Sequence, residues 1–327
     1  MTTRRRTALL GTAMLLAAAI APAAAWAQTG YPGRPVRIIV PFPPAGATDL
    51  IARGLGQQLS EKWGQPVVVE NRPGAASIIG IDAVAKAAPD GYTLLLGSNT
   101  LSLNRLLYKS LPYNVDRDIA PVVLMTRIPN LLVVNPEVPA RDLQQFIALA
   151  KSKPGQLNYA STGAGAAPHL FTELLTSMAD IKLTHVPYQG TTQAELDLVN
   201  NRVQAMVMNL TGALPSVQSG RLRALGVTTT KRAPLAPEVP SISEAGLPGY
   251  EAVGWFGIAT RKGTPPEIID RLNTDINAVL RTESFRKLLA QYGGEVVGGT
   301  ADEFLNYINA ESDKWGKVVQ SANIQLN

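Results

Sequence analysis

The chain has 327 residues, of which 46% are hydrophobic and 17% charged, and its formal net charge is +5 at pH 7. This apolar fraction excludes a disordered protein, and the length allows two domains with separate cores. The absence of cysteine excludes a disulfide scaffold, a thiolate metal site, a cysteine nucleophile and a lipid anchor on cysteine.

Residues 1–27 have the pattern of a secretory signal peptide. Three arginines precede an apolar run at residues 8–20, and Ala25-Trp26-Ala27 fits the small-x-small cleavage pattern. A membrane anchor is the alternative, but no second apolar run of spanning length follows, so we expect a soluble, exported protein cleaved after Ala27. The paired arginines leave both the general and the twin-arginine export routes open. Cleavage removes three arginines and no acidic residue, which takes away the main support for nucleic-acid binding.

Short β-rich runs alternate with helical patterns along the rest of the chain. Strands are expected at residues 36–40, 67–69, 93–96, 122–125, 131–134, 157–160, 183–186, 205–207, 224–227 and 256–259. Helices are expected at residues 51–59, 78–87, 141–151, 168–178, 192–200, 265–280, 284–291 and 301–321. This alternation predicts an α/β fold with mainly parallel or mixed sheets and helices on both faces.

Four strand-to-helix junctions are rich in Gly, Ala, Ser and Thr. We call residues 41–49, 70–77, 161–169 and 187–192 the first to fourth junctions. Small residues let the main chain approach a ligand closely, and a helix start presents unpaired N–H groups with partial positive charge. In open α/β sheets ligands bind at the carboxyl ends of the strands, where these junctions lie. The junctions therefore predict an anion site without a basic side chain, although ordinary turns have a similar composition.

Motifs of several enzyme and cofactor classes are missing from the sequence. It contains no G-x-x-x-x-G-K-[ST] loop, no H-E-x-x-H and no G-x-S-x-G, and Pro168 replaces the third glycine of a dinucleotide fingerprint beginning at Gly163. The two histidines, His169 and His185, are expected to be structural because neither spacing suggests a metal site. We therefore expect neither an enzyme nor a cofactor or metal site.

The junctions and several further motifs resemble those of the Bug-type extracytoplasmic receptors of tripartite tricarboxylate transporters. Each motif alone is weak, but their joint order and spacing are specific and cover essentially the whole chain after residue 27. The matching segments are residues 41–49, 70–77, 88–94, 161–170, 186–190, 244–250, 255–257 and 263–265.

This resemblance implies a type II-like, two-lobed periplasmic binding-protein fold with the ligand cleft between the lobes. Lobe 1 would comprise residues 28–127 and 254–327, and lobe 2 residues 128–253. A monomer in the periplasm would capture a small carboxylate by lobe closure and deliver it to the permease subunits of a tripartite tricarboxylate transporter. The implied ligand-binding residues are Pro44, Ala45, Gly46, Thr48, Asp49, Gly74, Ala75, Ala76, Ser98, Ser161, Thr162, Gly163, His169, Tyr188, Gly190, Thr191 and Asn209.

Met208 and Asp49 each leave two interpretations open. Met208 stands just before Asn209, where the family often has Asp, and it could favour a less polar ligand or point into the core. Asp49 could support the start of a helix as well as contact the ligand. A receptor that signals to a sensor kinase, a secreted α/β hydrolase and a structural protein are the competing functions.

Overall fold

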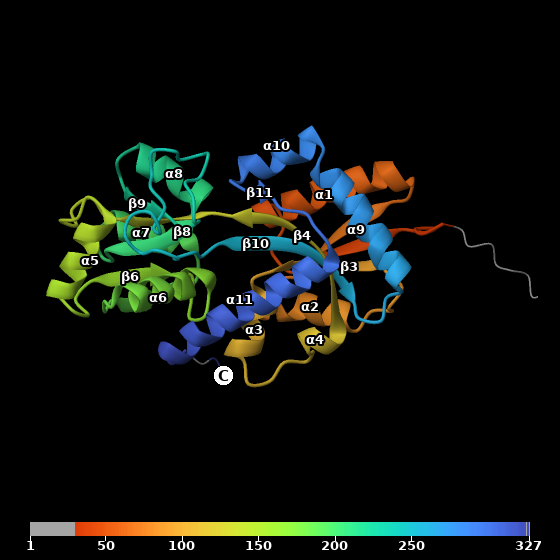
Figure 1. Ribbon diagram of the computed structural model, residues 1–327, viewed down its shortest axis with the longest axis horizontal. Helices are drawn as coiled ribbons and strands as arrows, with labels where there is room; N and C mark the ends of the chain where they lie inside the picture. Colours follow the sequence, from red (N-terminus) through yellow and green to blue (C-terminus); the bar gives the residue numbers. More distant parts are fainter. Residues whose placement is uncertain (1–29, 325, 327) are drawn as a thin grey trace, which may run out of the picture.

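The computed structural model describes residues 30–324 and 326, and it has two lobes, each built on a β-sheet flanked by helices (Figure 1). The signal peptide predicted for residues 1–27 and its cleavage site lie outside the described residues. Within the described part of the chain, no helix combines the length and the apolar character needed to cross a membrane.

The lobe that holds the start of the described chain contains a six-stranded sheet in the order β11-β4-β10-β3-β1-β2. Its strands are β1 (Val36–Val40), β2 (Val67–Asn71), β3 (Thr93–Ser98), β4 (Ile119–Ile128), β10 (Gly254–Arg261) and β11 (Glu295–Val296). Strands β2, β1 and β3 are parallel, whereas β10 is antiparallel to both of its neighbours, β3 and β4. Around this sheet lie α1 (Ala47–Trp63), η1 (Ala75–Ser77), α2 (Ile78–Ala85), α3 (Thr100–Leu107), α4 (Val115–Asp118), α9 (Pro266–Leu280), α10 (Glu283–Gln291) and α11 (Ala301–Ser321).

The other lobe contains a five-stranded sheet in the order β7-β6-β8-β5-β9. Its strands are β5 (Asn130–Val134), β6 (Asn158–Ser161), β7 (Thr184–Pro187), β8 (Ala205–Asn209) and β9 (Arg223–Val227). Strand β6 is parallel to β7 and β8, and β5 is antiparallel to β8 and β9, so both sheets are mixed rather than mainly parallel. Its helices are α5 (Leu143–Ser152), α6 (Ala167–Ala179), α7 (Thr191–Val199) and α8 (Leu210–Gln218).

Both sheets are buried on both faces, which explains why their strands are almost continuously apolar. Successive residues of a strand point to opposite faces, and β5 shows the consequence. Leu131 and Val133 pack into one apolar cluster, and Leu132 and Val134 into another. The helices predicted for both faces of the sheets are therefore confirmed.

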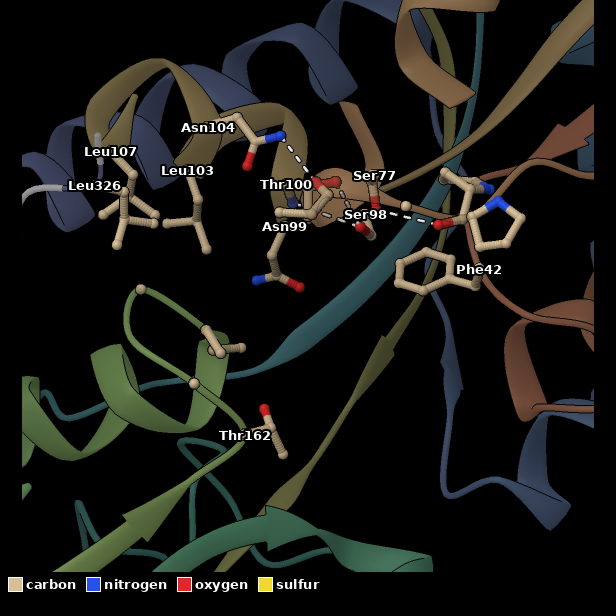
Figure 2. Close-up of a pocket in the computed structure, with 18 of the residues that line it drawn as sticks. Phe42, Ser77, Ser98, Asn99, Thr100, Leu103, Asn104, Leu107, Thr162 and Leu326 are labelled. Atoms are coloured by element: carbon tan, nitrogen blue, oxygen red, sulfur yellow. Dashed lines mark hydrogen bonds between the residues drawn. The ribbon is translucent and has the colours of Figure 1, made fainter. Parts of the chain in front are cut away.

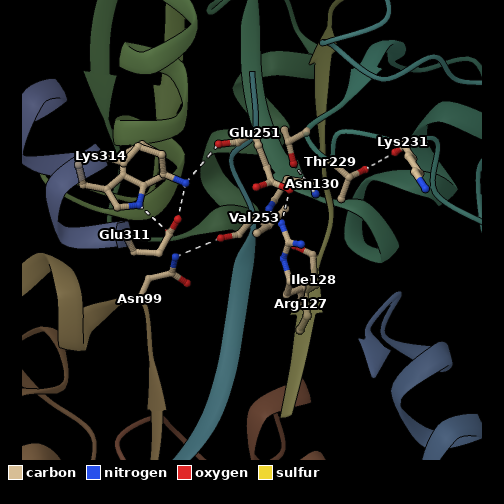
Figure 3. A network of polar contacts seen from close by, with 12 residues as sticks. Asn99, Arg127, Ile128, Asn130, Thr229, Lys231, Glu251, Val253, Glu311 and Lys314 are labelled. Atoms are coloured by element: carbon tan, nitrogen blue, oxygen red, sulfur yellow. Dashed lines mark hydrogen bonds and ion pairs between the residues drawn. The ribbon is translucent and has the colours of Figure 1, made fainter. Parts of the chain in front are cut away.

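Two chain segments cross between the lobes, and polar contacts join them (Figure 3). The β4–β5 segment passes through Ile128 and Asn130, and the second segment leads from β9 to β10. The backbone N–H of Asn130 donates to the hydroxyl of Thr228 over 3.0 Å, and the N–H of Thr228 donates back to the carbonyl of Asn130 over 2.9 Å. The side chains of Arg127 and Glu251 form an ion pair between the same two segments. These contacts hold the crossing segments side by side.

The C-terminal helix α11 connects the two lobes in a third place. Its Trp315 is fully buried and stacks on Phe171 of α6, with ring centroids 5.3 Å apart. The ammonium of Lys314 pairs with Glu311 and donates to the carbonyl oxygen of Glu251 in the second crossing segment (Figure 3). The end of α11 is thus packed on the five-stranded sheet's lobe, although the predicted boundaries assign residues 254–327 to lobe 1.

Candidate functional site

A cavity of about 760 Å³ lies between the two lobes (Figure 2). One wall comes from the six-stranded sheet's lobe, and the opposite wall is the loop that joins β6 to α6. Its volume falls within the range of small-molecule sites, about 300–1,000 Å³. The lining residues are Pro41, Phe42, Pro43, Pro73, Gly74, Ala76, Ser77, Ser98, Asn99, Thr100, Leu103, Asn104, Leu107, Tyr108, Thr162, Gly163, Ala164, Gly165, Ala166, Ala167, Pro168, Phe256 and Leu326.

The lining carries no formal charge. Among the described residues that line the cavity there is no Lys, Arg, His, Asp or Glu. Two helix starts do face it, because Ser98, Asn99 and Thr100 lead into α3, and Ala166 and Ala167 lead into α6. First-turn N–H groups have no partner within their helix and carry partial positive charge, which favours an anion. The cavity therefore offers a weakly positive, uncharged environment.

The second junction reaches the cavity in a strained conformation. Gly74 has φ +124°, and the three residues after it, Ala75, Ala76 and Ser77, have φ between +45° and +72°. The left-handed region is costly for residues with a Cβ, so such a run persists only where its surroundings hold it. Asn104 of α3 donates to the carbonyl of Ala76 over 3.0 Å and supplies part of this support. Ser77 and the right-handed residue after it can turn successive N–H groups toward one anion.

The first and second junctions are held together by Asp49. Its carboxylate accepts hydrogen bonds from the backbone N–H of Ala45 (3.0 Å), from Nε of Arg53 (2.9 Å) and from Nδ2 of Asn71 (2.9 Å). The hydrogen bond from Arg53 contributes most to holding the pKa of Asp49 below its usual value of 3.8. Asn71 also donates to the carbonyl of Phe42, which lines the cavity. The carboxylate of Asp49 is buried, and it positions the cavity wall from behind.

The start of α3 is a third wall segment, which the sequence patterns did not predict as a helix. At its beginning the hydroxyl oxygens of Ser98 and Thr100 lie 3.0 Å apart and share one hydrogen bond. The amide of Asn99 donates to the carbonyl of Val253 and accepts from the N–H of Trp255, both over 3.1 Å. Asn99 therefore ties this wall to the second crossing segment.

The opposite wall, residues 162–168, is supported by two stacked histidine rings. The rings of His169 and His185 lie 3.9 Å apart, and Nδ1 of His169 accepts from the N–H of Gly165 over 2.9 Å. The hydroxyl of Ser161 contacts Nε2 of His185 over 2.6 Å and also accepts from the N–H of Gly163 over 3.1 Å. Burial, with a contribution from the His185 charge, lowers the pKa of His169 from 6.5 to about 4. Burial lowers the pKa of His185 as well, so at pH 7 both histidines brace the wall in their neutral form.

Acidification from pH 7 to pH 5 should lower the stability of the protein through His169. The unfolded chain takes up a proton near the usual pKa of 6.5, whereas the folded chain does so only near 4, so the unfolded state binds more protons in this window. The contribution of the neutral ring is complete above pH 6.5 and is lost as the pH falls toward 4. Thermal unfolding at pH 7, 6 and 5 measures this dependence.

The matched variant for this pH dependence is His169→Asn, which keeps an acceptor but does not titrate. We expect its melting temperature to change less between pH 7 and pH 5 than that of the unmodified protein. Equal pH dependence in the two proteins would contradict the role given to His169.

Five of the predicted ligand-binding residues line the cavity, namely Gly74, Ala76, Ser98, Thr162 and Gly163. Ala75 lies within the same strained segment, and Ser161 and His169 lie behind the opposite wall. The other predicted residues are outside the cavity lining, and their part in binding stays a prediction. These are Pro44, Ala45, Gly46, Thr48, Asp49, Tyr188, Gly190, Thr191 and Asn209.

The residues of the fourth junction and of β8 are engaged elsewhere. The hydroxyl of Tyr188 contacts Asp197 over 3.0 Å, and the side chain of Asn209 caps α8 by accepting from the N–H of Thr211. Met208 is 2% exposed and packs in an apolar cluster, so of its two alternatives the core position is the observed one. The sequence reasoning in turn missed the lining residues that come from α3, from β10 and from Leu326.

The family model that describes the tripartite tricarboxylate transporter family receptor matches residues 51–324. The chain is similar to protein BugT of Bordetella pertussis, with 38% identity over 324 residues and 98% of both chains covered. It is also similar to the solved structure of Rpa4515 of R. palustris with adipate, with 37% identity, a TM-score of 0.79, and coverage of 90% of this chain and 99% of that one. The structure of MatC from Rhodopseudomonas palustris with bound malate gives 32% identity, a TM-score of 0.73, and coverage of 88% and 100%.

Proposed function

Because this chain belongs to the family of tripartite tricarboxylate transporter receptors, we propose that it captures a small carboxylate between its lobes in the periplasm and delivers it to a membrane transporter. The observation that carries this proposal is the cavity, whose walls come from both lobes. The solved structures of two similar proteins, one with adipate and one with malate, support a carboxylate as the ligand class.

The uncharged lining suits capture and later release. Hydrogen bonds from first-turn N–H groups and hydroxyls to a carboxylate are charge-assisted, and they become stronger when closure excludes water. A lysine or arginine at the same place would bind more tightly but would also have to be separated from the anion on delivery. The helix starts of α3 and α6 lie on opposite walls of the cavity. An anion between them would contact both starts only when the lobes are closed, so its binding would favour the closed arrangement over an open one.

Movement of the lobes would occur at the two crossing segments. They contain the Arg127–Glu251 ion pair and the reciprocal bonds of Asn130 and Thr228, while one apolar cluster of each lobe lies to either side. Rigid sheets joined by a few connecting residues are the usual arrangement for hinge closure. The end of α11 is packed on the lobe of the five-stranded sheet, so it would have to move with that lobe or slide against it.

A thermal-shift screen of small carboxylates tests the proposed function. A ligand that binds the folded state alone raises the unfolding free energy by about 2.7 kcal/mol at one hundred times its Kd, so the midpoint should rise with concentration. Uncharged amides of the same acids are the control, because they lack the charge that the helix starts favour. Shifts with the amides equal to those with the acids, or no shift with any acid, would contradict the proposal.

A further inference from the structure

We propose, as a refinement that rests on the proposed function, that the captured acid carries a hydroxyl group near its carboxylate and donates that hydroxyl to Oδ1 of Asn104. The observation behind this inference is a buried hydrogen-bond acceptor in the cavity wall to which no described residue donates. Asn104 is 2% exposed, lines the cavity and lies on α3, one helical turn after Thr100. The ligand class is therefore a small hydroxycarboxylate.

The orientation of the Asn104 amide follows from its partners. One of its two terminal atoms lies 3.0 Å from the carbonyl oxygen of Ala76 (Figure 2). A carbonyl oxygen only accepts hydrogen bonds, so this atom must be the nitrogen, Nδ2. Nδ2 also donates to the hydroxyl oxygen of Tyr113 over 3.3 Å. Both hydrogens of Nδ2 are thereby used, and Oδ1 is the atom of the amide that is left for another group.

Oδ1 of Asn104 faces the cavity. Figure 2 shows this oxygen turned away from Ala76, on the side of α3 that faces the opposite wall. Among the described residues, none donates a hydrogen bond to it. A buried polar atom almost always has a partner, because its removal from water otherwise costs free energy. A donor on the bound ligand would supply this partner.

Groups that can donate to a carboxylate lie one helical turn before Asn104. The hydroxyls of Ser98 and Thr100 share one hydrogen bond, so one of their two hydrogens is left for a ligand. Residues four positions apart on a helix lie on the same face, with their Cβ atoms about 5–6 Å apart. Thr100 and Asn104 have this spacing, and both line the cavity. A carboxylate beside Thr100 therefore brings a substituent on one of its nearest carbons within reach of Asn104.

A hydroxyl fits this position better than an ammonium or a keto group. An ammonium can donate to Oδ1, but its charge would have no acidic partner, because the described lining residues include no Asp or Glu. Removal of an unpaired charge from water is strongly unfavourable, whereas a neutral hydroxyl needs only hydrogen bonds. A keto oxygen only accepts, so it would place two acceptors against each other.

Calorimetric titration with pairs of acids that differ by one hydroxyl tests the inference. The pairs are lactate and propionate, 3-hydroxybutyrate and butyrate, 2-hydroxyglutarate and glutarate, and mandelate and phenylacetate, with both enantiomers of each hydroxy acid. In the pair that binds most tightly, we expect one enantiomer of the hydroxy acid to bind at least about tenfold more tightly than the plain acid, which leaves Oδ1 of Asn104 buried without a partner. Glutamate and 2-oxoglutarate should both bind more weakly than 2-hydroxyglutarate.

The outcomes separate the inference from the function on which it rests. A smaller difference in that pair, or tighter binding of the plain, amino or keto acid, would overturn the hydroxyl contact while supporting carboxylate capture. No binding of any of these acids would overturn both. The expected ranking supports both.

The variant Asn104→Leu tests whether Asn104 is the acceptor. It removes Oδ1 and should reduce the preference for the hydroxy acid to less than about twofold. It also removes the hydrogen bond to Ala76, but a looser wall weakens both acids of a pair alike, so the ratio of their affinities reports the acceptor. An unchanged ratio in a folded Asn104→Leu protein, checked by circular dichroism, would overturn the role of Asn104.

Asn135→Leu is the matched control for this variant. Asn135 is also 2% exposed, and its Nδ2 donates to two backbone carbonyls over 2.9 Å, but it lies outside the cavity lining. The substitution removes a buried amide of the same kind, so it should lower stability and keep the affinity ratio of the unmodified protein. Loss of the ratio in this variant as well would assign the preference to general loosening and overturn the contact with Asn104.

Discussion

Replacement of Gly74 by leucine should reduce carboxylate affinity at least about a hundredfold while the protein still folds. Gly74 lines the cavity and has φ +124°, a conformation that leucine adopts only with strain. The new side chain would have to displace Ile79, whose Cδ1 lies 2.7 Å from the position of a Cβ. Since Gly74 leads into the strained run of residues 75–77, a shift here redirects the N–H groups at the cavity wall.

The control for this substitution is Gly220→Leu. Gly220 also has positive φ, at +73°, but it is exposed, has open space around its Cβ position and is outside the cavity lining. Gly220→Leu also strains the backbone, although less than Gly74→Leu, because φ +124° and ψ +156° at Gly74 are essentially confined to glycine. Calorimetry of the two variants, each checked for folding by circular dichroism, separates a local effect on the site from a general loss of stability. Equal affinities in Gly74→Leu and the unmodified protein would remove the second junction from the site.

Replacement of Asp49 by alanine should destabilise the protein by about 2–4 kcal/mol and weaken carboxylate binding as well. The substitution removes three hydrogen bonds that the buried carboxylate accepts, from the N–H of Ala45, Nδ2 of Asn71 and Nε of Arg53, and each such bond contributes about 0.5–1.5 kcal/mol. Because these bonds join the first and second junctions, both parts of one cavity wall should loosen. Urea unfolding measures the loss of stability.

The pH dependence of this effect has a defined sign. The pKa of Asp49 is lowered in the folded state, so its contribution is present above the usual value of 3.8 and is lost as the pH falls below that value. Asp116→Ala is the control, since that carboxylate pairs with Arg105 near the surface and should contribute less than about 1 kcal/mol. Equal stability losses in the two variants at pH 7 would contradict the structural role of Asp49.

The regular elements could be predicted because their apolar patterns are strong. Strand β1 was predicted with its observed bounds, and α11 likewise, since a long amphipathic pattern leaves little choice. Helix α8 was missed because Pro215 lies inside it and Gly212 precedes that proline, and both residues usually indicate a break. The antiparallel direction of β10 could not be predicted, because strand direction does not alter the apolar pattern.

The candidate site could be predicted only in part, because the sequence marks the junctions but does not show which of them face the cavity. The composition of a junction indicates where a main chain can approach an anion, and residues of the first, second and third junctions do line the cavity. The fourth junction has the same composition but lies outside the lining, with Tyr188 bonded to Asp197. Which junctions face each other depends on the orientation of the lobes, which is set by the crossing segments and leaves no local signal in the sequence.

Helix α3 was not predicted from the sequence, although it forms part of the cavity wall. Its eight residues are too few for a clear helical period, and Leu103 and Leu107 contribute both to an apolar core cluster and to the cavity wall. Their second role depends on Leu326, more than two hundred positions away, and on the loop that follows β6. A pattern within one segment contains no information about such a distant partner.

A crystal structure of the protein with the carboxylate that raises its unfolding midpoint most in the thermal-shift screen tests the central claim most directly. The account predicts one acid between the lobes, with its carboxylate beside Ser98, Thr100 and Thr162. Contacts from both lobes to the same molecule would show that the cavity is the site of capture. An acid bound elsewhere on the surface, with this cavity filled by water alone, would contradict the account.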